Sequence, residues 1–128
     1  KLVYYAYELS ADDASFIQSY FDIMKKYSGL KGKAFSADLS KPVSLPKCDV
    51  CFLFKALDSL ESLKKGISER FIKEIDAKFI VVSFPTRSIS GKKRLKPRYW
   101  FLSTLERLNL GYKEIELENE VFYVVKKS

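Results

Sequence analysis

Two short, almost wholly apolar runs place the strongest constraint on how this chain can fold. CDVCFLF (residues 48–54) and KFIVVSF (residues 78–84) are rich in aromatic and β-branched side chains, and each precedes a stretch with helical spacing. A continuous apolar run of this length is typical of a strand covered on both faces, as in a parallel sheet. Buried strands that alternate with helices therefore predict an α/β fold.

The flanking segments extend this alternation. LVYYAYE (residues 2–8) has the composition of a strand, and Ser10 begins a capping box, SADD, for a helix that Gly29 ends. That helix has one apolar stripe, which we expect to be buried: Ile17, Tyr20, Phe21, Met24 and Tyr27. The remaining expected elements are a short strand in 32–39, a helix over 57–77 that breaks near Gly66, a helix over 97–111, and a hairpin of two strands over 112–127.

The predicted fold is a mostly parallel sheet with helices on both faces and a C-terminal antiparallel hairpin. The chain has 128 residues, a length that fits one domain with one core. No repeat, linker or low-complexity tract divides it, so we expect a single domain over residues 1–128.

The charge balance indicates a polyanionic partner. Lys and Arg outnumber Asp and Glu by 23 to 16, which gives a formal net charge of +7. This favours nucleic acid first and an anionic membrane second, and a basic surface without such a partner is the plain alternative. No apolar run reaches the roughly 18 residues that a membrane span needs, and Lys1 leads directly into a strand-like run without a secretory signal. We therefore expect a cytoplasmic protein with no membrane partner.

The chain contains no His, which excludes imidazole catalysis and His-ligated metals within it. Cys48 and Cys51 form a lone C-x-x-C, and their spacing on a strand directs the two thiols to opposite faces. We interpret them as reduced core cysteines, in preference to a zinc or redox site, and we expect no metal.

Polar residues follow the predicted strands at their carboxyl ends, where open α/β sheets bind ligands. Glu8 closes the first strand, Asp38 follows the second, and Lys55 ends CFLFK. From the pattern alone each has a plain interpretation: a solvated acid near a helix start, a turn residue and a snorkelling strand end. The strand over 78–84 leads directly into a cationic loop, PTRSISGKKRLKPR (residues 85–98), which we expect to lie at the same edge and to meet a polyanion.

Five segments of the chain resemble the aminoglycoside-resistance 16S rRNA guanine-N7 methyltransferases, in that family's order and at nearly its spacing. They are YYAYELS, SADLS, CDVCFLFKALDSLE, FIVVSFPTRSISGKK and NEVFYVV. VSFPTRSISGK is the most specific of them, and FKALDSLE is the next. The resemblance covers almost the whole chain and implies a class I methyltransferase fold that uses S-adenosylmethionine (SAM) to methylate ribosomal RNA of the small subunit.

The same resemblance implies roles for individual residues. Glu8 falls where the family has its ribose-binding acid, Asp38 matches the Asp near the adenine, and Lys55 matches the Lys beside the reaction centre. Ser83 and the residues after it fall in the loop that faces the target nucleotide. The expected site residues are catalytic Lys55, Ser83 and Arg87; cofactor-binding Glu8, Leu9, Asp38, Leu39 and Phe54; and RNA-binding Arg87, Ser88, Ser90, Lys92, Lys93, Arg94, Lys96 and Arg98.

The chain departs from the family pattern in two places. LKPRYW (residues 95–100) stands where the family usually has Gly-Met-Glu-x-Asn-Tyr, and only Tyr99 is kept. None of the five glycines forms a G-x-G cluster, so we expect the family's first strand and Gly-rich SAM turn to lie outside residues 1–128. The chain is then the C-terminal part of a methyltransferase, in which LVYYAYE and CDVCFLF pair directly or have a further segment between them.

Two other functions fit the same pattern less well. The main alternative is a non-catalytic, basic RNA-binding domain of methyltransferase ancestry. A SAM-binding domain that acts on a small molecule is a third, which the five basic residues within 92–98 disfavour because a small substrate does not need them.

Overall fold

The computed structural model describes residues 2–127 and divides into two compact units, unit 1 (Lys1–Val43) and unit 2 (Ser44–Ser128). In chain order the elements are β1 (Val3–Glu8), α1 (Ala11–Ser28), β2 (Lys31–Ser36), β3 (Cys48–Phe54), α2 (Leu57–Leu63), α3 (Ile67–Glu74), β4 (Ala77–Pro85), α4 (Tyr99–Arg107), β5 (Gly111–Glu116) and β6 (Glu120–Lys126).

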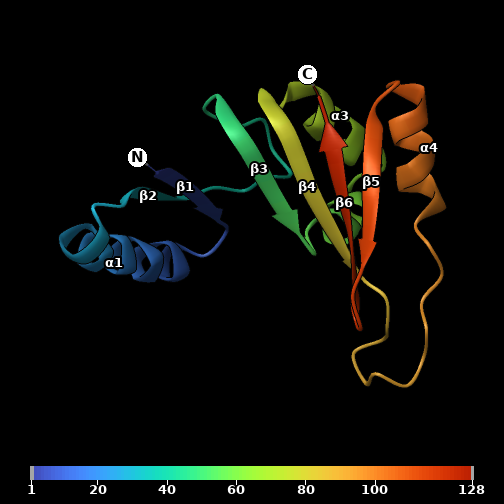
Figure 1. Ribbon diagram of the computed structural model, residues 1–128, viewed down its shortest axis with the longest axis horizontal. Helices are drawn as coiled ribbons and strands as arrows, with labels where there is room; N and C mark the ends of the chain where they lie inside the picture. The colour runs from blue at the N-terminus through green and yellow to red at the C-terminus, as the bar shows by residue number, and fades with distance from the viewer. Residues whose placement is uncertain (1, 128) are drawn as a thin grey trace. The chain divides into compact units, whose positions relative to one another are not determined.

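Unit 1 is a helix packed on two parallel strands (Figure 1). β1 and β2 pair along their whole length, and the last matched pair is Glu8 and Ser36. The predicted helix caps of α1 are confirmed. The Asp13 N–H donates to the Ser10 hydroxyl (3.2 Å) at its start, and Gly29 adopts a left-handed backbone (φ 72°) at its end.

The apolar stripe predicted for α1 is buried only in part. Phe21 is 6% exposed and packs against Tyr4 with 5.6 Å between ring centroids, whereas Tyr20 and Tyr27 are 52% and 82% exposed. The prediction that both tyrosines are buried was wrong. A sheet of two strands is narrow, so in unit 1 it covers only the side of the helix that carries Ala14 and Phe21.

Unit 2 is built on a four-stranded mixed sheet in the order β3-β4-β6-β5 (Figure 1). β3 and β4 are parallel, and β6 runs antiparallel to both β4 and β5, which confirms the predicted C-terminal hairpin. The predicted helix break is confirmed as well, because Gly66 lies between α2 and α3 with φ 90°. Both units thus have the α/β composition that the sequence predicts.

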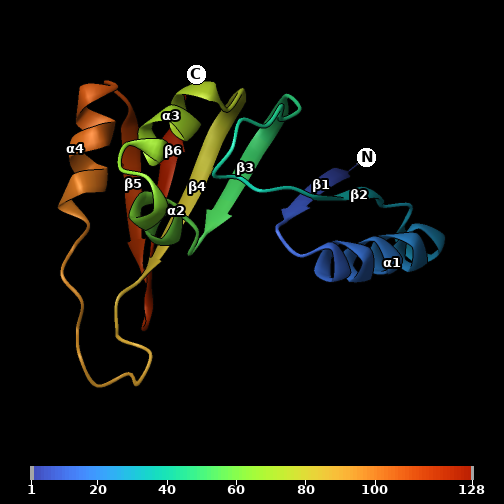
Figure 2. The same ribbon diagram turned by 180° about the vertical axis from the view of Figure 1, so that it is seen from behind.

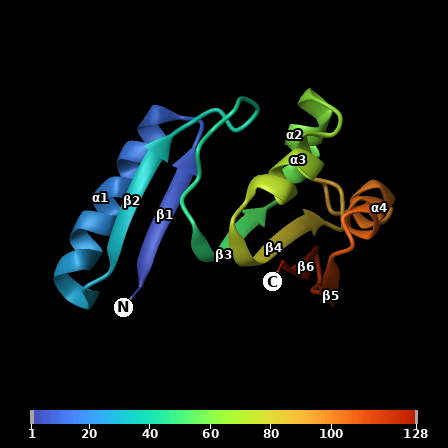
Figure 3. The same ribbon diagram turned by 90° about the horizontal axis from the view of Figure 1, so that it is seen from above.

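The helices of unit 2 lie against one face of its sheet (Figures 2 and 3). The core beneath them combines residues of the central strands and the helices: Leu57, Ile67, Ile72, Ile80, Val82, Phe84, Phe101, Leu105, Tyr123 and Val125. The opposite face is also apolar, and it is partly exposed at Val50, Phe52, Phe54 and Phe79. The sequence predicted cover on both faces. Within unit 2 the apolar run of β3 is covered on one face only.

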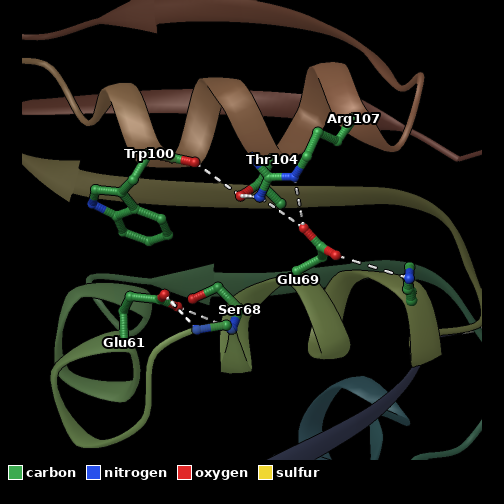
Figure 4. Close-up of polar contacts among 8 residues, drawn as sticks. Glu61, Ser68, Glu69, Trp100, Thr104 and Arg107 are labelled. Carbon is green, nitrogen blue, oxygen red and sulfur yellow. Dashed lines mark hydrogen bonds and ion pairs between the residues drawn. The ribbon is translucent and has the colours of Figure 1, made fainter.

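Polar contacts join α4 to α3 (Figure 4). Arg107 donates to the Glu69 carboxylate (2.8 Å) and to the Thr104 hydroxyl (3.1 Å), and that hydroxyl donates to the Trp100 carbonyl (2.8 Å). The Arg107 side chain is 60% exposed, so its pair with Glu69 is at the surface and contributes little to stability.

Cys48 and Cys51 are free thiols on opposite faces of β3, as the spacing predicts. Burial is the main cause that raises the pKa of Cys51 to about 11, so this thiol stays protonated at neutral pH. Over residues 2–127 no three potential metal ligands from His, Cys, Asp and Glu gather at one place. No helix in that range combines the length and hydropathy that crossing a bilayer requires.

Candidate functional site

Two carboxylates lie at the carboxyl ends of neighbouring strands in unit 1. Glu8 is the last residue of β1, and Asp38 comes two residues after β2. The Ala37 N–H donates to the Glu8 carbonyl (2.8 Å), which holds the two chain segments side by side. The Asp38 carboxylate accepts bonds from the hydroxyl (2.6 Å) and the N–H (3.0 Å) of Ser40. These bonds, the hydroxyl's first, lower the pKa of Asp38, so the group is ionised at neutral pH.

An apolar side chain accompanies each of these carboxylates. Leu9 follows Glu8 and is 73% exposed, and its carbonyl accepts a bond from the Ser36 hydroxyl (3.1 Å). Leu39 follows Asp38 and is half-buried. The four residues predicted to bind the cofactor in unit 1 therefore lie at one end of the two-stranded sheet.

In unit 2, Lys55 and Ser83 meet at the carboxyl ends of β3 and β4. Lys55 adopts a left-handed backbone (φ 52°), which is uncommon for a residue other than glycine. Its N–H donates to both the carbonyl (3.0 Å) and the hydroxyl (3.1 Å) of Ser83. Ser83 is fully buried, so its hydroxyl supports the Lys55 backbone and does not reach the surface.

The Lys55 side chain, in contrast, is 58% exposed. Its ammonium lies 3.8 Å from the Glu120 carboxylate, a surface pair of the weak kind. Phe54, the residue before it, is half-exposed on the uncovered face of the sheet and packs edge-on against Phe122 (5.7 Å between centroids). A half-exposed aromatic residue thus directly precedes a largely exposed cation in the chain.

The cationic loop folds back on itself as an ordered turn, which we call the cationic hairpin (residues 86–95). Arg87 and Arg94 face each other as an antiparallel bridge. Next to them the Ser88 N–H donates to the Lys93 carbonyl (2.8 Å). The cations therefore have a defined backbone beneath them.

Two of the serines predicted to contact RNA shape the tip of this hairpin. The Ser88 hydroxyl accepts a bond from the Lys93 N–H (3.2 Å) and lies 3.1 Å from the Ser90 hydroxyl. The Gly91 N–H donates to the Ser88 carbonyl (2.8 Å), which closes a β-turn, and Gly91 has φ 74°. Ser88 is part-buried and holds the turn, whereas Ser90 is exposed.

The cations of this segment differ in their surroundings. Arg94 bonds to the Glu116 carboxylate (2.8 Å) on β5. Within residues 2–127 no ion pair involves the other exposed cations of the segment, which are Arg87, Lys92, Lys93 and Lys96. These four charges remain in solvent, where they can meet phosphate groups.

Arg98 is turned inward. Its guanidinium bonds to both carboxylate oxygens of Asp58 (2.6–3.3 Å), donates to the Pro85 carbonyl (2.9 Å), and lies 5.2 Å from the centroid of the Phe84 ring. The side chain is only 13% exposed. Because Pro85 is the last residue of β4, Arg98 joins the two ends of the cationic segment. These contacts fix the position of the two ends of the cationic segment.

Sequence reasoning did not identify Asp58 or Glu120, the partners of Arg98 and Lys55. Asp58 precedes Arg98 by forty positions, and no local pattern connects them. The only local signal for Asp58 is its place in the first turn of a helix. Acids are common there because they suit the helix dipole, so this position does not predict a partner.

Comparison with solved structures defines the class of protein. The structure of the 16S rRNA methylase ArmA superposes with a TM-score of 0.71 at 25% identity, covering 100% of this chain and 63% of that one. The fold is that of a methyltransferase, as predicted.

The sequence comparisons then give the family. The family described as ribosomal RNA methyltransferase (FmrO) matches residues 1–120, so the chain belongs to this family. The 16S rRNA (guanine(1405)-N(7))-methyltransferase of Micromonospora echinospora is 32% identical over 82 residues, and that of Frankia casuarinae is 25% identical over 128. The matches cover 62% and 97% of this chain but only 30% and 44% of these relatives, so the chain spans less than half of their length.

Proposed function

We propose that this chain is the part of a SAM-dependent ribosomal RNA methyltransferase that holds the adenosine of the cofactor and contacts the RNA. The observation that supports it most is the ordered cationic hairpin directly after the carboxyl end of β4, with four exposed cations in or beside it. Open α/β sheets bind their ligands at this end of the strands. Guanine N7 of 16S rRNA, the target in the names of the two curated relatives, is the target we propose.

The two strand-end carboxylates of unit 1 fit the adenosine part of SAM. Glu8 suits the ribose hydroxyls, which donate to a carboxylate, and Asp38 suits the adenine amine. Leu9 and Leu39 offer apolar surface of the kind that a purine ring packs on, and Phe54 offers such a surface at the end of β3 in unit 2. The 16S rRNA methyltransferase RmtF, which shares this fold at 19% identity, is known with S-adenosyl-L-homocysteine, the form of SAM without its methyl group. SAM supplies a methyl group on a positively charged sulfur.

Methyl transfer to guanine N7 needs little acid–base catalysis from this chain. Guanine N7 already has a lone pair, so the residues must align the base and exclude water. We propose that Lys55 and Arg87, both exposed, contact the nucleotide or its phosphates. Ser83 supports Lys55 from below through its buried hydroxyl, and the absence of His from the sequence is consistent with such a mechanism.

The strand edges support a larger sheet than the one described. β1 and β3 belong to separate sheets, and in the described part of the chain each pairs with one neighbour only. Unpaired strand backbone next to exposed apolar side chains, such as Phe52 and Phe54, favours the addition of another strand. We propose that a further strand completes the cofactor site, and that residues 1–128 alone bind SAM weakly. Calorimetry with SAM on residues 1–128 and on the full protein tests this, and tight binding by the shorter chain would show it to be wrong.

Glu8→Ala tests the cofactor assignment. The loss of a charge-assisted pair of hydrogen bonds should weaken SAM binding by about 1.5–3 kcal/mol, which is about tenfold or more in Kd. Glu118→Ala, which removes an exposed acid from the β5–β6 turn, is the control and should leave the Kd unchanged. An unaltered Kd for Glu8→Ala would remove Glu8 from the site.

A double variant, Lys92→Ala with Lys93→Ala, tests the RNA contact. Each neutralised phosphate contributes slightly less than one unit to the log–log dependence of affinity on salt. The double variant should therefore bind a 16S rRNA fragment more weakly and flatten that slope by roughly 1.5 units. Lys64→Ala with Lys65→Ala, an exposed pair after α2, is the matched control. If the two double variants behave alike, the cationic hairpin is only a solvated surface.

A further inference from the structure

One apolar side chain lies at the tip of the cationic hairpin. Ile89 follows Ser88 in the β-turn that the Gly91 N–H closes, and its relative exposure is 110%, as high as in a fully extended chain. This is the highest value among the exposed large apolar residues of the described chain. Scattered apolar residues are normal on protein surfaces, so exposure alone indicates no contact. The structure around Ile89 adds two further observations.

The first is that the backbone below Ile89 is fixed. Ile89 occupies the first central position of the turn, and the Ser88 carbonyl and hydroxyl together accept bonds from Gly91 and Lys93 (2.8 and 3.2 Å). The Ser88 and Ser90 hydroxyls lie 3.1 Å apart on either side of it. The turn therefore presents Ile89 in a defined position, and little conformational entropy is lost if it is then buried in a complex.

The second observation is the charge around the tip. Arg87 and Lys93 lie on the two arms of the hairpin, and Lys92 follows the turn directly. A surface of this charge selects a polyanion, and an isoleucine cannot bond to phosphate. In a nucleic acid the apolar surfaces that such a side chain can reach are the faces of the bases. Proteins that deform nucleic acids insert isoleucine, leucine or phenylalanine between stacked bases in this way.

We propose that Ile89 is an apolar wedge that inserts against a base step of ribosomal RNA while the surrounding cations hold the phosphates. This rests on the proposed function and adds to it how the hairpin engages its RNA. Unstacking a base step next to the target makes the target guanine accessible, because an enzyme that modifies a base must first take it out of the stack. The Ile89 side chain neutralises no phosphate, so its contribution to binding should not depend on the salt concentration.

The experiment uses the full protein and a 16S rRNA fragment that spans guanine 1405, with 2-aminopurine placed beside that guanine to report unstacking by a rise in fluorescence. Ile89→Ala should weaken binding about tenfold, abolish the rise, and leave the salt slope unchanged. Ile89→Leu, which keeps the apolar volume, should bind within about twofold of wild type. Leu63→Ala, on an aliphatic side chain that is 72% exposed at the end of α2, is the matched control and should change nothing.

The outcomes separate this inference from the proposed function. If the Lys92 and Lys93 double variant weakens binding but Ile89→Ala behaves like Leu63→Ala, the wedge is refuted and the RNA contact stands. If both the Lys double variant and Ile89→Ala bind as wild type does, the RNA contact of the hairpin fails as well. If Ile89→Ala weakens binding to small ribosomal subunits but not to the naked fragment, Ile89 contacts a ribosomal protein, and the wedge is again refuted.

Discussion

Replacement of Arg98 by Ala should destabilise unit 2 by about 3 kcal/mol. The two-point bond to Asp58, whose side chain is 39% exposed and so partly screened by solvent, contributes about 1–2 kcal/mol. The bond to the Pro85 carbonyl adds about 1 kcal/mol, and the cation–π contact with Phe84 adds about 0.5 kcal/mol. A loss of this size lowers the Tm of a unit as small as unit 2 by roughly 12–24 °C.

Urea unfolding followed by tryptophan fluorescence measures this loss. The chain has one tryptophan, Trp100, which lies on α4 with its ring 5.8 Å from that of Phe84, so it reports directly on this region. Arg98→Lys should recover little, because an ammonium cannot bond at the same time to the Asp58 carboxylate and the Pro85 carbonyl.

Arg107→Ala, at the other end of the helix that Arg98 precedes, provides a matched control. Arg107 also bonds to a carboxylate, that of Glu69, but its side chain is 60% exposed, and its loss should cost less than about 1 kcal/mol. The reasoning is refuted if Arg98→Ala costs no more than Arg107→Ala, since Arg98 would then be an ordinary surface cation.

Two further variants test the hydrogen bonds of Glu61 and the packing at Gly32. Burial favours a higher pKa for Glu61, but backbone N–H bonds at the start of α3, that of Gly66 (2.7 Å) first, outweigh it and lower the pKa. The resulting stability is present above the ordinary Glu pKa and lost as pH falls through the lowered one, so Glu61→Gln should cost about 1 kcal/mol at pH 7 and much less at pH 3 in urea unfolding. An equal cost at both pH values would contradict this. Gly32→Ala should destabilise the chain by about 1–3 kcal/mol, because the added Cβ would collide with the Phe21 ring. Gly111→Ala is the control and should cost little, because the space around Gly111 is open. Equal Tm values for the two variants would disprove this packing.

Local patterns predicted most of the elements. The runs CDVCFLF and KFIVVSF became β3 and β4, because β-branched and aromatic residues fit a pleated surface that is at least half-buried. Ser10, Gly29 and Gly66 act on the backbone within a few residues of themselves, so they marked the helix ends correctly. The strand-end positions of Glu8 and Asp38 followed from the same boundaries.

What the sequence did not predict depends on contacts between distant residues. The basic run 92–98 gave Arg98 the same expected role as Lys92 and Lys93, and only the fold brings Asp58 to its guanidinium. Ser83 belongs to the most specific motif of the chain, yet burial turns its hydroxyl toward the Lys55 backbone. The exposure of Tyr27 depends on how many strands lie beneath α1, which no helical periodicity reveals.

Methyl transfer to guanine N7 of 16S rRNA is the central claim, and one measurement tests it most directly. The full protein is incubated with small ribosomal subunits and radiolabelled SAM, and the RNA is then cleaved with borohydride and aniline, which act at N7-methylguanine. We expect label in 16S rRNA, cleavage at a single guanine, and loss of both with Glu8→Ala at limiting SAM. Absence of label and cleavage from a folded protein that binds both SAM and the subunit would contradict the claim and leave a non-catalytic RNA-binding protein.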